Sequence, residues 1–150
     1  MSESKIKSAD WPYLVFTAGE EKYAVDSSCV KEIVRNNQIY PVPFAPPYIV
    51  GIINCYSNPV AAVDWALFDG KEAEKRKEDI FLVLKDCEDT ALLVSAVDEF
   101  KYEKEISKQD FAKSEEHDIF SGTISWNDSI IPLVDLKAVI AKIKRDLENE

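Results

Sequence analysis

The stretch YIVGIINCYSNPVAAVD, residues 48–64, decides the fold that the sequence predicts. An apolar run over residues 48–56, interrupted by Gly51, leads to turn-forming residues at 57–59, and a second apolar run follows at 60–63. Short apolar runs on either side of Ser, Asn and Pro are typical of paired, buried strands. This stretch therefore predicts a β-hairpin that belongs to the interior of the molecule.

The same pattern returns near the carboxyl end of the chain. Gly51, Ile53, Val60, Val63 and Asp64 recur 71 positions later as Gly122, Ile124, Ile131, Val134 and Asp135. Leu14-Val15-Phe16 likewise matches Leu82-Val83-Leu84, 68 positions later. Because glycines and aspartates agree as well as aliphatic residues, the pattern favours two similar β subdomains over a chance likeness between strands. Units of about 70 residues bury little surface alone, so we expect them to share one interior.

The remaining apolar runs predict a mainly β architecture. Alternating residues at 11–17 and 22–25 indicate a hairpin around Gly19. Further strands are expected over 80–84, 90–97 and 98–102, and a hairpin over 119–126 and 130–134 around Asn127-Asp128. The prolines before the central hairpin, Pro41, Pro43, Pro46 and Pro47, indicate an extended, non-helical connection.

Helical signals occur beside these strands. Ser27 and Ser28 are suitable N-caps, and Cys29–Val34 after them predicts a short helix or one turn. Residues 64–68 predict another helical turn. Apolar residues recur at helical spacing at Leu136, Val139, Ile140, Ile143 and Leu147. We therefore expect one amphipathic helix over about 136–148, packed on the sheet.

The charge pattern suggests how the chain is organised. It carries 18 basic and 28 acidic residues, a net charge of −10, and residues 69–79 are almost entirely charged. Such a run predicts a solvated loop. We expect a single domain over 1–150, with a flexible amino-terminal segment at 1–10. The loop would then separate a first β subdomain at about 11–68 from a second at about 80–134.

Length and composition limit the classes of function. The chain has 150 residues, which is the usual size of one folded domain. Its composition, 46% hydrophobic and 11% aromatic, argues against disorder. An acidic surface repels nucleic acid and anionic lipid, so we expect neither as a partner. Residues 1–10 lack the apolar core of a signal peptide, and no stretch approaches the about 20 apolar residues of a membrane span. A cytoplasmic location without direct membrane insertion is expected.

Catalytic and metal-binding patterns are missing from the sequence. Cys29, Cys55 and Cys87 lie far apart without C-x-x-C spacing, and His117 is the single histidine. Zinc sites use several such ligands, so no metal site is expected. No phosphate-binding glycine motif and no nucleophile elbow occurs. The sequence therefore predicts neither an enzyme nor a bound cofactor.

Several side chains suit protein binding instead. Phe44, Tyr48 and Tyr56 flank turn-rich regions, where an exposed ring is costly unless a partner covers it. The segment Val30–Ile33 sets apolar side chains beside the acid Glu32, which suits a docking edge. The alternative that each ring covers the core stays open for each one taken alone.

The order of these blocks resembles a known family. The residues concerned are Leu14-Val15-Phe16, Gly19, Tyr23-Ala24-Val25-Asp26, Val30-x-Glu32-Ile33, Pro43-x-x-Pro46, Val50-Gly51-Ile52-Ile53-Asn54, Val63-Asp64, Leu93-Val94, Val97-Asp98, Gly122 and Ile131–Leu136. Together they resemble the CheW-like chemotaxis coupling proteins, over about residues 13–140.

The resemblance implies two intertwined, SH3-like five-stranded β-barrel subdomains with short helices and a carboxy-terminal helix. It also implies a non-catalytic adaptor that couples the cytoplasmic tips of chemoreceptors to the regulatory domain of the histidine kinase CheA in signalling arrays. The residues that it assigns to receptor binding are Val30, Glu32, Ile33, Asn54, Tyr56 and Ser57. By analogy, the kinase-facing surface would lie on the second subdomain near Val97, Asp98 and Phe100.

One block departs from the family pattern. Members usually carry Asn-Leu-Arg-Gly where this chain has Asn54-Cys55-Tyr56-Ser57, and often Asp where it has Ser95. Replacing Arg with Tyr removes a cation and leaves a flat, largely apolar ring. A second hypothesis follows, in which the chain is a divergent scaffold for another signalling protein, such as a response regulator or a methyltransferase. A third, a purine-binding domain, has no phosphate loop or basic pocket to support it.

Overall fold

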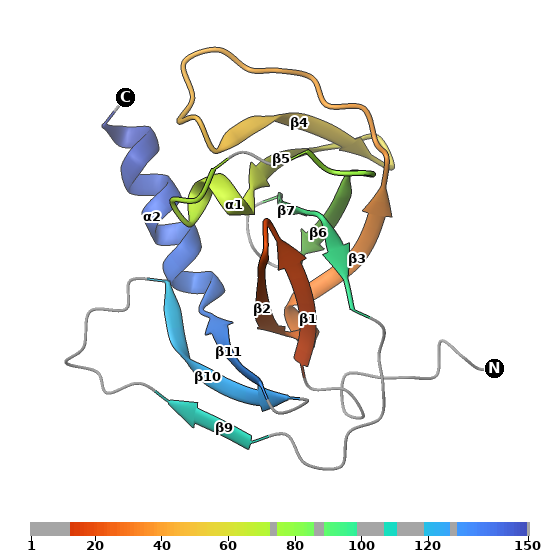
Figure 1. The fold of residues 1–150 in the computed structure, drawn as a ribbon. Helices are drawn as coiled ribbons and strands as arrows, with labels where there is room; N and C mark the ends of the chain where they lie inside the picture. The colour runs from red at the N-terminus through yellow and green to blue at the C-terminus, as the bar shows by residue number, and fades with distance from the viewer. Residues whose placement is uncertain are drawn as a thin grey trace.

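Two β-sheets and a carboxy-terminal helix make up the fold in the computed structural model (Figure 1). The structure describes residues 13–72, 75–85, 89–98, 107–110, 119–126 and 129–149. The strands are β1 (Tyr13–Ala18), β2 (Glu21–Asp26), β3 (Val30–Arg35), β4 (Ile49–Cys55), β5 (Asn58–Asp64), β6 (Ile80–Leu84), β7 (Thr90–Val94), β8 (Ala96–Val97), β9 (Ser107–Asp110), β10 (Phe120–Trp126) and β11 (Ser129–Val134). The helical elements are the 3-10 turn η2 (Ser27–Cys29), α1 (Trp65–Phe68) and α2 (Leu136–Glu148). The mainly β class and the carboxy-terminal helix are confirmed.

The two sheets repeat one strand order. The first sheet runs β8-β1-β2-β11-β10-β9 and the second runs β3-β6-β7-β5-β4. In each, a parallel pair, β2–β11 or β7–β5, joins two antiparallel hairpins. Leu133 and Ala62, which the sequence repeat relates, pair with Ala24 and Ala91 at equivalent places. The strand order therefore confirms the sequence repeat. The first sheet differs only in having a sixth strand, β9.

Each sheet takes strands from both sides of the charged loop at 69–79. β1 and β2 join the late strands β8 to β11, whereas β3, β4 and β5 join β6 and β7. Each sheet therefore contains strands from both halves of the sequence repeat, and neither of the predicted subdomain ranges, 11–68 and 80–134, coincides with one sheet. The run 90–97, predicted as one strand, divides at Ser95 as the chain crosses between sheets. There the Ser95 hydroxyl donates to the Thr17 carbonyl at 2.8 Å.

Of the two alternatives predicted at Cys29–Val34, a short helix or one turn, the structure has a single turn, and it lies earlier, at Ser27–Cys29. Asp26 caps a single 3-10 turn by accepting a hydrogen bond from the Ser28 amide at 2.9 Å, and the chain then extends into β3. β3 pairs with β6, and its residues alternate between half-buried and exposed. That period of two, in a segment containing β-branched Val30 and Ile33, favours a strand over a helix.

The central hairpin is confirmed, but its turn lies earlier than predicted. Cys55 pairs with Asn58, so the turn consists of Tyr56 and Ser57 rather than residues 57–59. Their φ angles of 51° and 67° are those of a type I′ turn, whose twist matches that of the flanking strands. Pro59 marked the turn in the sequence, yet it lies within β5.

The proline-rich connection crosses over β4 at Gly51. Tyr40 forms an isolated bridge with Ile52, and the Ile52 amide donates to the Tyr40 carbonyl at 2.8 Å. A Cβ on Gly51 would lie 2.4 Å from that carbonyl oxygen. Glycine is required here because the two backbones approach so closely. The prediction of an extended, non-helical connection is confirmed.

Some predictions fall outside the described residues. They include the flexible segment at 1–10, the strand at 98–102 beyond its first residue, and the turn at Asn127-Asp128. The hairpin strands on either side of that turn are confirmed as β10 and β11.

An aromatic cluster forms the centre of the core. Phe16, Tyr23 and Trp65 are fully buried, with ring centroids 5.4 to 5.9 Å apart. The Tyr23 hydroxyl donates to Asp69 at 2.6 Å, and burial, followed by the Asp69 contact, raises the pKa of Tyr23. Val139 and further apolar residues of α2 pack against the same cluster. Residues from both halves of the repeat thus share one interior, as predicted.

The charged loop is not wholly solvated, because Arg76 points inward. Its side chain is only 14% exposed and donates to Asp64 Oδ2 and to Asp79 Oδ1, each at 3.2 Å. The other oxygen of Asp64, Oδ1, accepts from the Leu67 amide at 3.3 Å and so caps α1. A single carboxylate therefore holds both the start of a helix and the loop that follows it.

Replacing Arg76 with alanine is expected to destabilise the fold by about 3 kcal/mol, because buried Asp64 loses its ion-pair partner. Chemical denaturation measures this. The matched control is Arg35→Ala, since Arg35 pairs with Glu78 at the same 3.2 Å distance while both side chains stay 51% and 42% exposed. The control should lose less than about 1 kcal/mol. Equal losses for both variants would contradict the inward role of Arg76.

Candidate functional site

Two of the residues that the family resemblance assigned to receptor binding line one small cavity at the second sheet. It has a volume of about 200 Å³, and Glu32 from β3 and Tyr56 from the β4–β5 turn both line it. The other lining residues are Lys31, Cys55, Asn58, Val60, Val83, Leu84 and Asp89. Segments far apart in the sequence therefore meet at this end of the sheet.

The other predicted receptor residues do not line this cavity. Val30 packs partly against the main core, so it contributes to folding as well as to the surface. Ile33 is 37% exposed on β3, and Asn54 and Ser57 are exposed at the end of the hairpin. The Asn54 carbonyl accepts a hydrogen bond from the Asn37 side chain at 3.2 Å, which ties this hairpin to the preceding loop.

Tyr56 is presented to solvent by the geometry of its turn. Its side chain is 87% exposed, and its positive φ of 51° fixes the backbone direction at the tip of the hairpin. An exposed ring on a rigid hairpin loses little conformational entropy when a partner covers it. Tyrosine is enriched among residues that dominate binding energy at interfaces. Tyr56 is therefore an exposed ring that a partner could cover at little cost in conformational entropy.

The floor of the cavity is neutral. Burial raises the pKa of the Cys55 thiol, the nearby Glu32 carboxylate raises it further, and Lys31 opposes that effect. A thiol with a raised pKa stays protonated and is a poor nucleophile. The cavity thus offers shape, two acids (Glu32 and Asp89) and one base (Lys31), which suits recognition of a protein surface.

The residues predicted to face the kinase lie on the first sheet. Val97 pairs with Phe16 at the edge of that sheet and packs against the main core. The Asp98 carboxylate accepts from Lys22 at 3.0 Å, and the Asp98 amide donates to the Val15 carbonyl at 2.9 Å. Phe100 lies outside the described residues. The structure therefore separates Val97 and Asp98 from Glu32 and Tyr56, which belong to the other sheet.

Sequence reasoning missed part of the exposed apolar surface. Phe44 was singled out and is 93% exposed, with a positive φ of 59°. Ile130 was assigned only to a strand, yet it is 74% exposed, whereas its neighbour Ile131 is buried. A pair of adjacent isoleucines does not show which one faces the core, because only the pairing register decides this. Tyr48, another ring singled out, is half-buried and packs on Phe68 of α1.

Other classes of site find no support in the described part of the chain. No group of three or more metal-ligating side chains occurs there, and Cys87 and His117 lie outside it. Within the same ranges, no helix is long and apolar enough to cross a membrane.

Comparison with known proteins adds to this geometry. Residues 12–144 match the family described as the CheW-like domain. The chain belongs to this family. It is 27% identical over 138 residues to the chemotaxis protein CheW of Rhizobium meliloti (strain 1021), a match covering 89% of each chain. It is also 32% identical over 91 residues to the chemotaxis protein CheW of Treponema pallidum (strain Nichols), covering 58% of this chain and 54% of that relative, about half its length.

A solved structure agrees with the fold. The scaffolding protein TtCheW from Thermoanaerobacter tengcongensis superposes with a TM-score of 0.69 at 24% identity, covering 81% of this chain and 86% of that one. The SH3-like arrangement of two subdomains expected from the resemblance is therefore confirmed. Membership of the CheW-like family supports the role of a chemotaxis adaptor and scaffold, a class without catalytic function.

Replacing Ser57 with glycine is expected to stabilise the protein by about 0.5–1 kcal/mol, because the left-handed conformation of Ser57 is strained for a residue with a side chain. Thermal or chemical denaturation measures the change. Ser129→Gly provides the control, since Ser129 is also exposed but lies in a strand without a positive φ, where glycine should destabilise by a similar amount. Destabilisation by Ser57→Gly would contradict the assigned turn geometry.

Proposed function

We propose that this chain couples chemoreceptors to the histidine kinase CheA in cytoplasmic receptor arrays, by binding both without chemistry of its own. The observation that carries the proposal is the separation of two surfaces. Glu32 and Tyr56 meet at the cavity of the second sheet, while Val97 and Asp98 lie on the first. A receptor tip at one surface and the regulatory domain of CheA at the other need not compete.

The mechanism in this proposal is differential affinity. An adaptor transmits a signal when it binds one state of the receptor, or of the kinase, better than the other state. The proposal treats the two sheets as one rigid body because they share one core, which includes aromatic residues from β1, β2 and α1. Rigidity matters because a loosely joined adaptor would absorb a change at one surface without passing it on.

Tyr56 is expected to dominate the affinity for a receptor. Tyr56→Ala should weaken binding to a chemoreceptor cytoplasmic-tip fragment about tenfold or more, because an exposed ring at the centre of an interface is a typical hot spot. Tyr40→Ala is the matched control, since Tyr40 is also exposed but does not line the cavity. Calorimetry with purified fragments measures both. Equal effects of the two variants would remove Tyr56 from the receptor surface.

Asp98 is expected to matter for the kinase and not for the receptor. Asp98→Ala should weaken binding to the CheA regulatory domain about fivefold and leave receptor binding unchanged, because a charged group at an interface contributes through paired contacts. Glu21→Ala is the control, since Glu21 is another ion-paired acid of the first sheet, held by Lys71 at 3.5 Å. An unchanged kinase affinity in Asp98→Ala would place the kinase elsewhere on the surface.

A second candidate function rests on Tyr56-Ser57, where family members carry arginine and glycine. A surface without that cation suits a partner that offers no matching acid, such as a response regulator or a methyltransferase used in place of a standard receptor. Tyr56→Arg separates the two candidates. Receptor binding by the wild type that Tyr56→Arg abolishes supports coupling through tyrosine. Receptor binding by Tyr56→Arg alone supports the divergent scaffold.

A further inference from the structure

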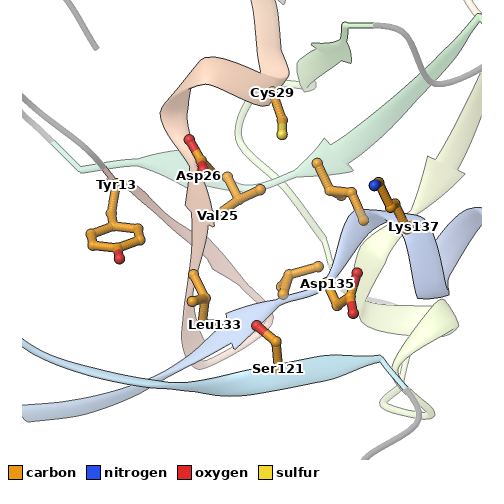
Figure 2. A pocket seen from close by; sticks show the side chains of 10 residues that line it. Tyr13, Val25, Asp26, Cys29, Ser121, Leu133, Asp135 and Lys137 are labelled. Carbon is orange, nitrogen blue, oxygen red and sulfur yellow. The ribbon is translucent and has the colours of Figure 1, made fainter. Parts of the chain in front are cut away.

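A second and larger cavity lies at the start of α2 (Figure 2). It has a volume of about 290 Å³. Its lining residues come from β1 and β2, from η2, from the β10–β11 hairpin and from the first turn of α2: Tyr13, Val25, Asp26, Cys29, Ser121, Leu133, Val134, Asp135, Leu136 and Lys137. The carboxylates of Asp26 and Asp135 reach the cavity from different elements, as Figure 2 shows.

The internal repeat identifies the counterpart of this cavity in the other half of the chain. Asp135 corresponds to Asp64. Asp64 ends β5, Asp135 directly follows β11, and each caps the helix that comes next. Asp135 Oδ1 accepts from the Ala138 amide at 3.3 Å, just as Asp64 Oδ1 accepts from the Leu67 amide at 3.3 Å. The two aspartates therefore hold their helices in the same way.

The two aspartates differ in what their second oxygen binds. Asp64 Oδ2 accepts from the guanidinium of Arg76, which also reaches Asp79 just before β6. No donor among the described residues bonds Asp135 Oδ2, and the space beside it is the cavity bordered by Tyr13 at the start of β1. β1 and β6 are equivalent strands of the two sheets. The cavity thus occupies the place that Arg76 fills in the first half.

The second half of the repeat does not supply an arginine from the equivalent position. After α1 the chain turns back as the charged loop that carries Arg76, but α2 continues for 13 residues. The residue 71 positions after Arg76 is Leu147, in the last turn of α2, where it is 45% exposed. The longer helix therefore removes the internal arginine. The second carboxylate at the cavity is that of Asp26 at the end of β2, whose Oδ1 accepts from the Ser28 amide at 2.9 Å and the Ser28 hydroxyl at 2.7 Å.

We propose that this cavity receives an arginine side chain from a partner protein. The carboxylates of Asp26 and Asp135 would accept hydrogen bonds from the guanidinium, whose planar, forked donors suit such acceptors. Val25, Leu133 and Leu136 would cover the aliphatic stem, as apolar surface does for long basic side chains. Lys137 lines the same cavity and competes with an incoming cation. This cavity shares no lining residue with the cavity of Glu32 and Tyr56, and the proposal does not depend on the proposed function.

The test uses the full chain and a small probe, N-acetylarginine amide, with its neutral citrulline analogue as control. Backbone amide resonances followed by NMR should shift around Asp26 and Leu136 as the arginine probe saturates at millimolar concentration. The citrulline analogue should leave them unchanged. Asp135→Asn should weaken probe binding about tenfold, because it removes the charge while asparagine still caps the helix. Lys137→Ala should strengthen it.

Matched variants keep the test decisive. Glu148→Gln changes the charge on the same helix by the same amount, far along α2, and should bind the probe like the wild type. If Asp135→Asn does not fold, Asp26→Asn replaces it. Equal binding of the citrulline analogue, or unchanged binding by the aspartate variant, overturns the proposal. If the probe binds only after Lys5→Ala and Lys7→Ala are introduced together, the amino-terminal segment of this chain is the occupant of the cavity. That result overturns the partner assignment.

Discussion

The parallel pairs β2–β11 and β5–β7 are the constraint on which the rest of the structure depends. Through them, the hairpin that begins each half of the repeat lies in the sheet completed by the other half. Neither sheet can form from one half alone, so Phe16, Tyr23 and Trp65 are buried only when both are in place. Because the sheets are interlocked in this way, a surface on one keeps a fixed relation to a surface on the other.

Much of this architecture could be predicted from the sequence. The glycine and aspartate positions of the repeat were informative because each has a backbone role: Gly51 allows a close crossing and Asp64 caps a helix. The exchange of strands between halves left no local signal, since pairing partners far apart in sequence do not alter the apolar pattern. The short helix that was one alternative at Cys29–Val34 does not form for a related reason, because pairing with β6 outweighs two good N-cap residues and leaves only the turn at Ser27–Cys29.

The candidate sites were less predictable than the fold. The meeting of Glu32 and Tyr56 depends on the relative placement of β3 and the β4–β5 turn, which only the tertiary structure gives. The inward turn of Arg76 was hidden in a run of charges that looked wholly solvated. The ion pair between Arg76 and Asp64 suggests an arginine as the occupant of the cavity beside Asp135, because the lining residues of that cavity do not by themselves identify one. The two halves of the repeat therefore differ at one place: Arg76 fills the space beside Asp64, whereas the equivalent space beside Asp135 is a cavity.

The central claim is that two partners bind at once to separate faces of one rigid adaptor. Analytical ultracentrifugation of the chain with a saturating CheA regulatory domain and a chemoreceptor-tip fragment tests it most directly. The account predicts a ternary complex that contains both partners, since the cavity of Glu32 and Tyr56 and the edge at Val97 share no residue. Displacement of one partner by the other would contradict it.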